Sequence, residues 1–380
     1  MIQSAFFNIR KEGKKLIGIK IGKVIQILKE NENKTEVLVK IKDKEYKAIN
    51  YNRLTGKIDL EDELILNTTA LDLSLGTGGY HFVIANLSHP TKDLSEGGHI
   101  MKLRYSPYQL KVFASEEQDS EDHDIFNQFE SLEGMPVIVG TLHSMLPAIV
   151  EVLKTLKEDI KITYIMTDGA ALPIDLSNMV TNLKENKIIH KAITIGNAFG
   201  GDLDCVNIYN GLIAAKEITK CHIAVVTMGP GIVGTGTKFG FTGVEQGNII
   251  DAVNDLGGIP IAVPRMSFAD QRKRHQGISH HTLTVLNTIA KTKAIVGLPK
   301  LEKEKSEYIK DQLKHTTILS KHKIVYEDCE EIYSILKHSN LNMRTMGRSF
   351  EEEKEYFITC GLCAKIALKI LDDPQSNFLE

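Results

Sequence analysis

The sequence predicts an α/β protein in which a small all-β, barrel-like domain precedes a parallel-sheet α/β domain. The periodicity of the hydrophobic residues changes along the chain. Residues 15–90 alternate apolar and polar side chains with a period of two, whereas short apolar runs alternate with helix-like stretches beyond residue 135. The length of 380 residues also exceeds what one hydrophobic core usually serves. We therefore expect domains at residues 1–115 and 135–380, joined by an acidic connector at 116–134.

The composition excludes several classes of protein. Hydrophobic residues make up 42% of the chain and charged residues 25%, which is typical of a globular protein rather than a disordered one. A net charge of −3 provides no positive field for a nucleic acid, and no run of 18 apolar residues predicts a membrane span. We expect a cytoplasmic protein with reduced thiols, because its five cysteines are odd in number and scattered.

The first half of the chain reads as a meander of short strands. Val37, Val39 and Ile41 alternate with polar residues after a polar turn at residues 31–34, and similar runs recur up to residue 87. Several short strands at this spacing predict a small barrel, and both OB-like and SH3-like barrels fit. Residues 115–133 are acidic with little apolar periodicity, which indicates a solvated connector or loop.

The second half has the pattern of a Rossmann-like domain. Apolar runs predict strands at residues 136–140, 162–167, 192–196, 222–228, 259–264 and 293–298. Amphipathic stretches predict helices at residues 145–156, 206–218, 244–256 and 282–290. Continuous apolar strands joined by helices indicate a parallel sheet that is covered on both faces.

Ligands of such sheets bind beyond the carboxyl ends of the strands. The longest segment of this kind, residues 229–243, holds six glycines and several threonines. Glycine lets backbone amides approach a ligand closely, and the following helix places its positive end nearby, so an anion is the expected guest. The alternative is a long surface loop. The residues predicted to bind the anion are Gly229, Gly231, Gly234, Thr235, Gly236, Thr237 and, after the next strand, Arg265.

No cofactor is assigned by these glycines. The segment lacks the Gly-Lys-Ser/Thr ending of a P-loop. Gly229, Gly231 and Gly234 match GxGxxG, but the acidic residue that accompanies a dinucleotide fingerprint is missing.

Residues 265–281 form a second cluster, rich in arginine and histidine. His275 and His280 are candidate acids or bases, tuned by Asp168 or Asp270, because histidine transfers protons near neutral pH. Ser279 is the expected N-cap of a helix beginning near His280. No metal site is predicted, since the histidine spacing matches no metal motif. The alternative is a solvated basic turn with one histidine in the core.

Three long motifs resemble a bacterial family catalogued as a domain of unknown function. They are MGPGIVGTGTKFGFTG, RMSFADQRKRHQGISHHT and MRTMGRSFEEE. The resemblance spans nearly the whole chain and implies that the glycine, arginine and histidine motifs occur together in one protein type, without implying an activity. In the last motif, Arg344 and Arg348 are four residues apart and precede three glutamates, which predicts the start of a helix.

Two functions of different classes follow. The first is an enzyme that acts on a small phosphorylated or carboxylated metabolite at the carboxyl ends of the sheet. The second is a non-catalytic module that senses a metabolite or binds a protein. The expected partner is a small anionic molecule, with no nucleic acid or membrane, and a homo-oligomer is compatible with either function.

Overall fold

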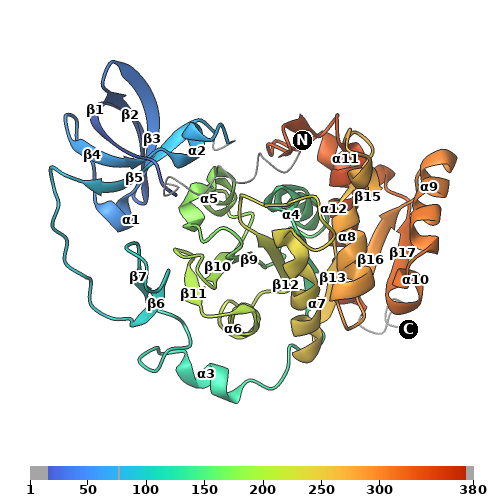
Figure 1. The fold of residues 1–380 in the computed structure, drawn as a ribbon. Helices are drawn as coiled ribbons and strands as arrows, with labels where there is room; N and C mark the ends of the chain where they lie inside the picture. The colour runs from blue at the N-terminus through green and yellow to red at the C-terminus, as the bar shows by residue number, and fades with distance from the viewer. Residues whose placement is uncertain (1–15, 76–77, 374–380) are drawn as a thin grey trace, which may run out of the picture. The chain divides into compact units, whose positions relative to one another are not determined.

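The computed structural model describes residues 16–75 and 78–373, which form two compact units (Figure 1). The first unit ends at Glu96 and the second begins at Gly97. The sequence placed this boundary at residue 115, so 19 residues that we assigned to the β domain belong to the second unit.

The first unit is a closed five-stranded barrel with the order β1-β2-β3-β5-β4. The predicted barrel is therefore confirmed. Strand β1 pairs with both β2 and β4, and β3 and β5 pair in parallel. This connectivity is the OB-type alternative of the two that the sequence left open. The strands are β1 (Ile19–Glu30), β2 (Lys34–Ile41), β3 (Lys44–Tyr51), β4 (Glu63–Asn67) and β5 (Tyr80–Asn86).

The alternating pattern of these strands fills the barrel. Val37 and Val39 of β2 are fully buried and pack with Val24, Leu64 and Leu66. Two single-turn helices, α1 (Asn52–Thr55) and α2 (Thr69–Asp72), connect the strands.

Residues 97–134 contain regular structure, both before and within the acidic connector that we predicted at residues 116–134. They form the β6 (Ile100–Lys102) and β7 (Leu110–Val112) hairpin and helix α3 (His123–Gln128). The acidic Glu117 is only 3% exposed, because its carboxylate accepts hydrogen bonds from the backbone amides of His99 and Ala114. Composition alone does not distinguish such a carboxylate from a solvated one.

The second unit contains an eight-stranded sheet with the order β11-β10-β9-β12-β8-β13-β16-β17, as Figure 1 shows in part. All of its neighbouring strands pair in parallel, which confirms the predicted α/β sheet. The strands are β8 (Pro136–Val139), β9 (Ile162–Thr167), β10 (Lys191–Ile195), β11 (Leu203–Cys205), β12 (Ile223–Met228), β13 (Ile259–Ala262), β16 (Ile295–Pro299) and β17 (Lys323–Glu327).

Helices cover both faces of this sheet. On one face the core includes side chains of α4 (Leu146–Leu156), α5 (Asn178–Glu185), α11 (Glu330–Lys337) and α12 (Lys354–Asp372). On the other face it includes side chains of α6 (Ile208–Ile213), α7 (Glu245–Asp255), α9 (Lys303–Lys314) and α10 (Ile318–Lys321), together with the π-helical turn Val285–Ile289 that continues α8 (His280–Thr284).

The chain reverses direction across the sheet beside β8. Strand β12 lies between β8 and β9, and it returns from the edge strand β11. The helices that follow β8 and β12, α4 and α7, pack on opposite faces of the sheet. Their connecting loops therefore diverge, which opens a crevice at the carboxyl ends of these two strands.

Two further findings concern the cysteines and the expected absence of a membrane span. All five cysteines are free and buried, with Cys360 and Cys363 inside α12. None of the helices in the described part of the chain is long and apolar enough to cross a membrane.

Candidate functional site

The segments that the sequence singled out lie at one edge of the sheet. Asp168 follows β9, Gly229 follows β12, and Arg265 lies three residues beyond β13. Because these strands run in parallel, the three segments leave the sheet on the same side.

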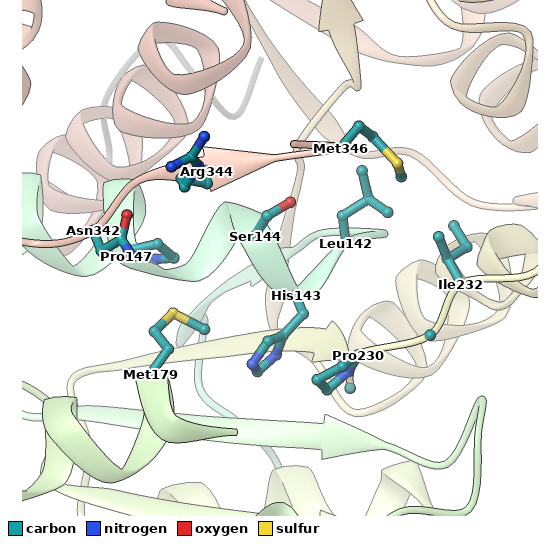
Figure 2. Close-up of a pocket in the computed structure, with 12 residues that line it drawn as sticks. Leu142, His143, Ser144, Pro147, Met179, Pro230, Ile232, Asn342, Arg344 and Met346 are labelled. Atoms are coloured by element: carbon teal, nitrogen blue, oxygen red, sulfur yellow. The ribbon is translucent and has the colours of Figure 1, made fainter. Parts of the chain in front are cut away.

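A cavity of about 350 Å³ opens at the crevice between β8 and β12 (Figure 2). Figure 2 shows His143 between Met179 and Pro230, with Arg344 and Met346 on the opposite side. Most of the wall is apolar, with a few polar groups, which is the usual make-up of a small-molecule site. The lining residues are Leu142, His143, Ser144, Pro147, Met179, Gly229, Pro230, Gly231, Ile232, Asn342, Arg344 and Met346.

His143 is a fixed polar group of this cavity. Its Nε2 lies 2.7 Å from the hydroxyl of Ser177 and its Nδ1 lies 3.1 Å from the hydroxyl of Tyr164. Burial lowers the pKa of His143 to about 4, so its imidazole is neutral at pH 7. The adjacent Ser144 instead bonds to the hydroxyls of Tyr356 and Thr345, at 2.7 and 3.0 Å. The two neighbours therefore do not form a nucleophile–base pair.

The arginine of the cavity comes from a β-hairpin. Strands β18 (Arg344–Thr345) and β19 (Arg348–Ser349) pair around Met346 and Gly347, which have φ values of 48° and 83°. Two successive positive φ values are typical of a tight hairpin turn. The helix predicted to start at Arg344 is wrong, because residues 344–349 form this hairpin and α12 begins only at Lys354.

Glu245, the first residue of α7, is a buried titratable group beside the ends of β9 and β12. Its Oε1 accepts a hydrogen bond of 2.5 Å from Thr167, which lies opposite Met228 in the β9–β12 register. Met228 directly precedes Gly229 in the cavity wall. Burial raises the pKa of Glu245 to about 7, and the nearby charge of Asp168 acts in the same direction.

The glycine segment divides into two parts. Gly229 and Gly231 line the cavity, and Gly231 has a φ of 104°, which other residues rarely adopt. Thr235 and Thr237 lie further along. Their hydroxyls are 2.9 Å apart and bond to the backbone of Gly240.

The remaining predicted glycines lie beside the arginine and histidine cluster. A Cβ atom on Gly234 would stand 3.7 Å from the ring of His281, and one on Gly236 would stand 4.0 Å from the guanidinium of Arg274. Phe241 stacks on His281, with ring centroids 3.9 Å apart. The two motifs that the sequence selected therefore meet in space.

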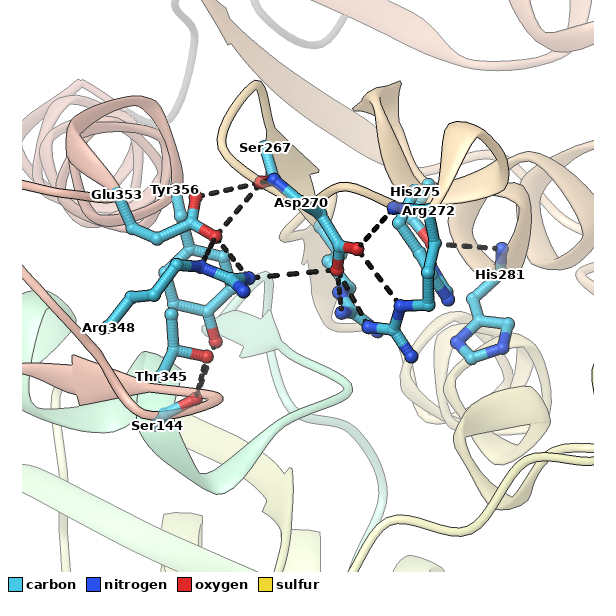
Figure 3. Close-up of polar contacts among 12 residues, drawn as sticks. Ser144, Ser267, Asp270, Arg272, His275, His281, Thr345, Arg348, Glu353 and Tyr356 are labelled. Atoms are coloured by element: carbon cyan, nitrogen blue, oxygen red, sulfur yellow. Dashed lines mark hydrogen bonds and ion pairs between the residues drawn. The ribbon is translucent and has the colours of Figure 1, made fainter.

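Arg265 takes part in the ion-pair network around Asp270. Figure 3 shows Asp270 between Arg272 and Arg348. Arg265 is 4% exposed, and its Nη2 lies 3.4 Å from Oδ2 of Asp270. Asp270 also accepts two side-chain hydrogen bonds from Arg272, at 2.9 and 2.7 Å, and lies 3.6 Å from Arg348. Arg348 in turn binds the buried Glu353, which accepts from Ser267.

This network changes the expected roles of two residues. Side-chain hydrogen bonding by Arg272 holds the pKa of Asp270 far below its usual range, so Asp270 stays a carboxylate and is no acid or base near pH 7. Arg265 forms an ion pair with Asp270 in this structure. A structural ion pair with Asp270 is also the alternative role that the sequence offers for Arg265.

The histidines predicted to transfer protons form a compact group. The ring centroids of His275 and His280 are 5.0 Å apart, those of His275 and His281 also 5.0 Å, and those of His280 and His281 4.2 Å. Burial lowers the pKa of all three, for His275 and His281 to about 3, and neighbouring arginines add to the effect. Ser279 caps α8 as predicted, accepting from the backbone amide of His281.

Asp168 lies elsewhere on the edge. Its Oδ2 accepts from the backbone amide of Asn197 at 3.0 Å and from its side-chain amide at 3.3 Å. The acidic side chain nearest in sequence to the histidines, Asp270, is already held by arginines. The predicted pairing of His275 or His280 with Asp168 thus has no hydrogen bond to support it among the described residues.

Sequence reasoning missed His143 and Arg344, which line the cavity, and the buried carboxyl of Glu245, which bonds to Thr167. Glu245 was interpreted as a favourable first-turn charge, His143 was considered only as a partner of Ser144, and Arg344 was placed in a helix. The available signal was positional, since His143 lies just beyond an apolar run that forms a central strand and Glu245 lies just beyond the glycine segment. Their burial, which sets their pKa values, depends on the tertiary packing.

The comparisons with known proteins identify a family only. The family described as a protein of unknown function (DUF3866) matches residues 47–364, so the chain belongs to this family. No curated protein and no solved structure matches the chain.

Proposed function

We propose that the protein is an enzyme acting on a small metabolite that carries an anionic group, bound in the cavity between β8 and β12. The observation that carries the proposal is the position of this cavity, where the loops after two neighbouring parallel strands diverge. Sheets of this type bind their ligands at such switch points.

The anionic group of the ligand would bind Arg344. This arginine is exposed at the cavity, and one of its nitrogens donates to the carbonyl of Gly347, 3.0 Å away. Its other donors are suited to a carboxylate or a phosphate, which accept the planar fork in pairs. The apolar side chains of Met179, Ile232 and Met346 would contact the carbon skeleton.

Glu245 would transfer the proton. A general acid or base works best when its pKa lies near the working pH, and the pKa of Glu245 is about 7. A carboxyl group with this pKa accepts a proton from one reacting atom and returns it to another without a large penalty in either state. A sensing module needs no such group, and for that reason we prefer an enzyme to the sensing alternative.

The test begins with a panel of carboxylated and phosphorylated metabolites, screened by thermal shift and followed by NMR for turnover. Arg344→Ala is expected to weaken binding about ten- to a hundredfold, as the loss of a charge-assisted hydrogen bond implies. Arg104→Ala, at an exposed arginine away from the cavity wall, is the matched control and should bind normally.

Glu245→Gln separates catalysis from binding. The amide retains the shape but transfers no proton, so turnover should fall about a hundred- to ten-thousandfold with little change in affinity. Glu304→Gln, at an exposed first-turn glutamate of α9, controls for the loss of a helix charge. Binding without turnover in the wild type would favour the sensing module, and equal turnover in Glu245→Gln would remove Glu245 from the mechanism.

A further inference from the structure

Three histidine side chains converge beside the glycine segment. His275, His280 and His281 each offer one ring nitrogen, and these nitrogens all lie within 4.8 Å of one another. His275 precedes α8, whereas the other two are its first residues. The group therefore comes from a short stretch of chain that folds back on itself.

Two nitrogens of this group are buried without a partner. His280 Nε2 and His281 Nδ1 have no hydrogen-bond partner among the residues that the structure describes. A buried polar atom without a hydrogen-bond partner is unfavourable and rare in native proteins, so each such atom calls for an explanation. A bound ligand that accepts electron pairs from both would supply one.

His275 is oriented in the manner of a metal ligand. Its Nδ1 lies 2.8 Å from the hydroxyl of Ser279, which also accepts from the backbone amide of His281. When Nδ1 donates to this hydroxyl, the lone pair of His275 is on Nε2. Metal-binding histidines are usually fixed by a hydrogen bond at the second ring nitrogen.

We propose that His275, His280 and His281 bind a divalent transition-metal ion, with zinc the best match. Imidazole nitrogens suit zinc, and three protein ligands with a fourth open position are the usual set of a catalytic zinc. Nitrogens bound at about 2.0–2.1 Å to one tetrahedral ion stand roughly 3.3–3.4 Å apart, which small ring rotations reach from the observed limit of 4.8 Å. The unpartnered atoms are Nε2 of His280 and Nδ1 of His281, which lie at different distances from the backbone. Two adjacent histidines can therefore bind the same ion.

The charges around the three histidines favour an anionic fourth ligand. The positive charges of Arg265, Arg272 and Arg274 lower the pKa of one or more of these histidines, while Asp270 acts in the opposite direction on His275. These arginines keep the ligands unprotonated but repel a bare cation. An anion in the open position, such as hydroxide or a carboxylate, offsets that repulsion, so the site is a metal centre that takes an anionic fourth ligand.

The test is a zinc titration of the full chain against a chromogenic chelator. The wild type should bind one zinc ion per chain. His280→Gln and His281→Gln should each bind at least about a hundredfold more weakly, since loss of an outer-sphere partner alone weakens metal sites ten- to a hundredfold. His315→Gln, at an exposed histidine of the same unit, is the matched control and should bind like the wild type.

Cobalt provides a readout that does not depend on the variants folding. Cobalt(II) bound to the wild type should give the intense visible absorption of a four-coordinate site, and addition of zinc should abolish it. A wild type that binds zinc no better than His280→Gln overturns the proposal, and so does a weak six-coordinate cobalt spectrum.

The proposed metal site and the proposed enzymatic function can be refuted independently of each other. Arg344→Ala and Glu245→Gln should leave zinc affinity unchanged, because neither residue is among the three ligands. A protein that binds zinc but no metabolite of the panel would refute only the proposed function. Metabolite turnover by a protein that binds no zinc would refute only the metal site.

Discussion

Two clusters of charged and titratable residues lie within residues 265–281, and they differ in whether their polar atoms have partners. Asp270 is held by Arg265, Arg272 and Arg348, and its backbone amide is bonded to Ser267. The adjacent histidine group instead keeps two buried nitrogens without partners among the described residues. The partners of the polar atoms therefore indicate which cluster is structural and which one is suited to a ligand.

The largest effect that this comparison predicts is on the Asp270 cluster. Asp270→Ala should lower the free energy of unfolding by about 3–5 kcal/mol, because it leaves the buried guanidinium of Arg265 without its carboxylate. The measurement is urea denaturation at pH 7. Arg272→Ala is the control, and its effect should be smaller because that side chain is 46% exposed and solvent can replace it.

The same variant has a pH dependence with a defined sign. The pKa of Asp270 is lower in the folded protein than its unfolded value of about 3.9, so its stabilisation is fully present above that value. The difference between wild type and Asp270→Ala should therefore shrink as the pH falls below about 4. A difference under about 1 kcal/mol at pH 7 would show that the network is not structural.

How much of the fold was predictable depends on where each strand lies. The central strands are continuous apolar runs, and β9 matches its predicted range of 162–167. The edge strands β11 and β17 were missed, since only one residue of each is buried and their sequences carry little hydrophobic signal. Burial on both faces produces the pattern that sequence reasoning detects.

The site was less predictable than the fold. The sequence placed the glycine segment and the arginine–histidine segment at one sheet edge, because strand direction follows from the βαβ pattern. It assigned an anion to Arg265, which in the structure is an ion-pair partner of Asp270. Spacing along the chain cannot reveal that His275 folds back onto His280 and His281, since that contact depends on the turn between them.

Glu245 gives the second test, since it is a buried carboxyl whose environment disfavours its charge. Its folded pKa of about 7 lies above the unfolded value of about 4.3, so ionisation destabilises the folded state. This loss of folding stability is absent below about pH 4, grows between pH 4 and 7, and stays constant above pH 7. Glu245→Gln should therefore be more stable than the wild type at pH 8, by roughly 3–4 kcal/mol, since one pKa unit corresponds to about 1.36 kcal/mol.

Thermal melts at pH 4 and pH 8 measure this change, and the two proteins should be equally stable at pH 4. Glu304→Gln, at the exposed glutamate of α9, should show no such dependence. A variant that is less stable than the wild type at pH 8 would mean that Thr167 and its neighbours stabilise the carboxylate more than burial penalises it.

The smallest expected effect is on Arg344, which shares a hairpin with Arg348 but not its surroundings. Arg348 is bound to Glu353 at 2.5 Å, and that carboxylate is 1% exposed. Arg344 is exposed and donates only to the hairpin carbonyl of Gly347 among the hydrogen bonds described. Arg348→Ala should therefore lower the free energy of unfolding by about 1.5–3 kcal/mol, as expected for a lost charged hydrogen bond, whereas Arg344→Ala should change it by less than about 0.5 kcal/mol. Urea denaturation of both variants tests the contrast within one pair of short strands. If Arg344→Ala were as destabilising as Arg348→Ala, Arg344 would be a structural residue of the hairpin, and its assignment to a ligand would fail.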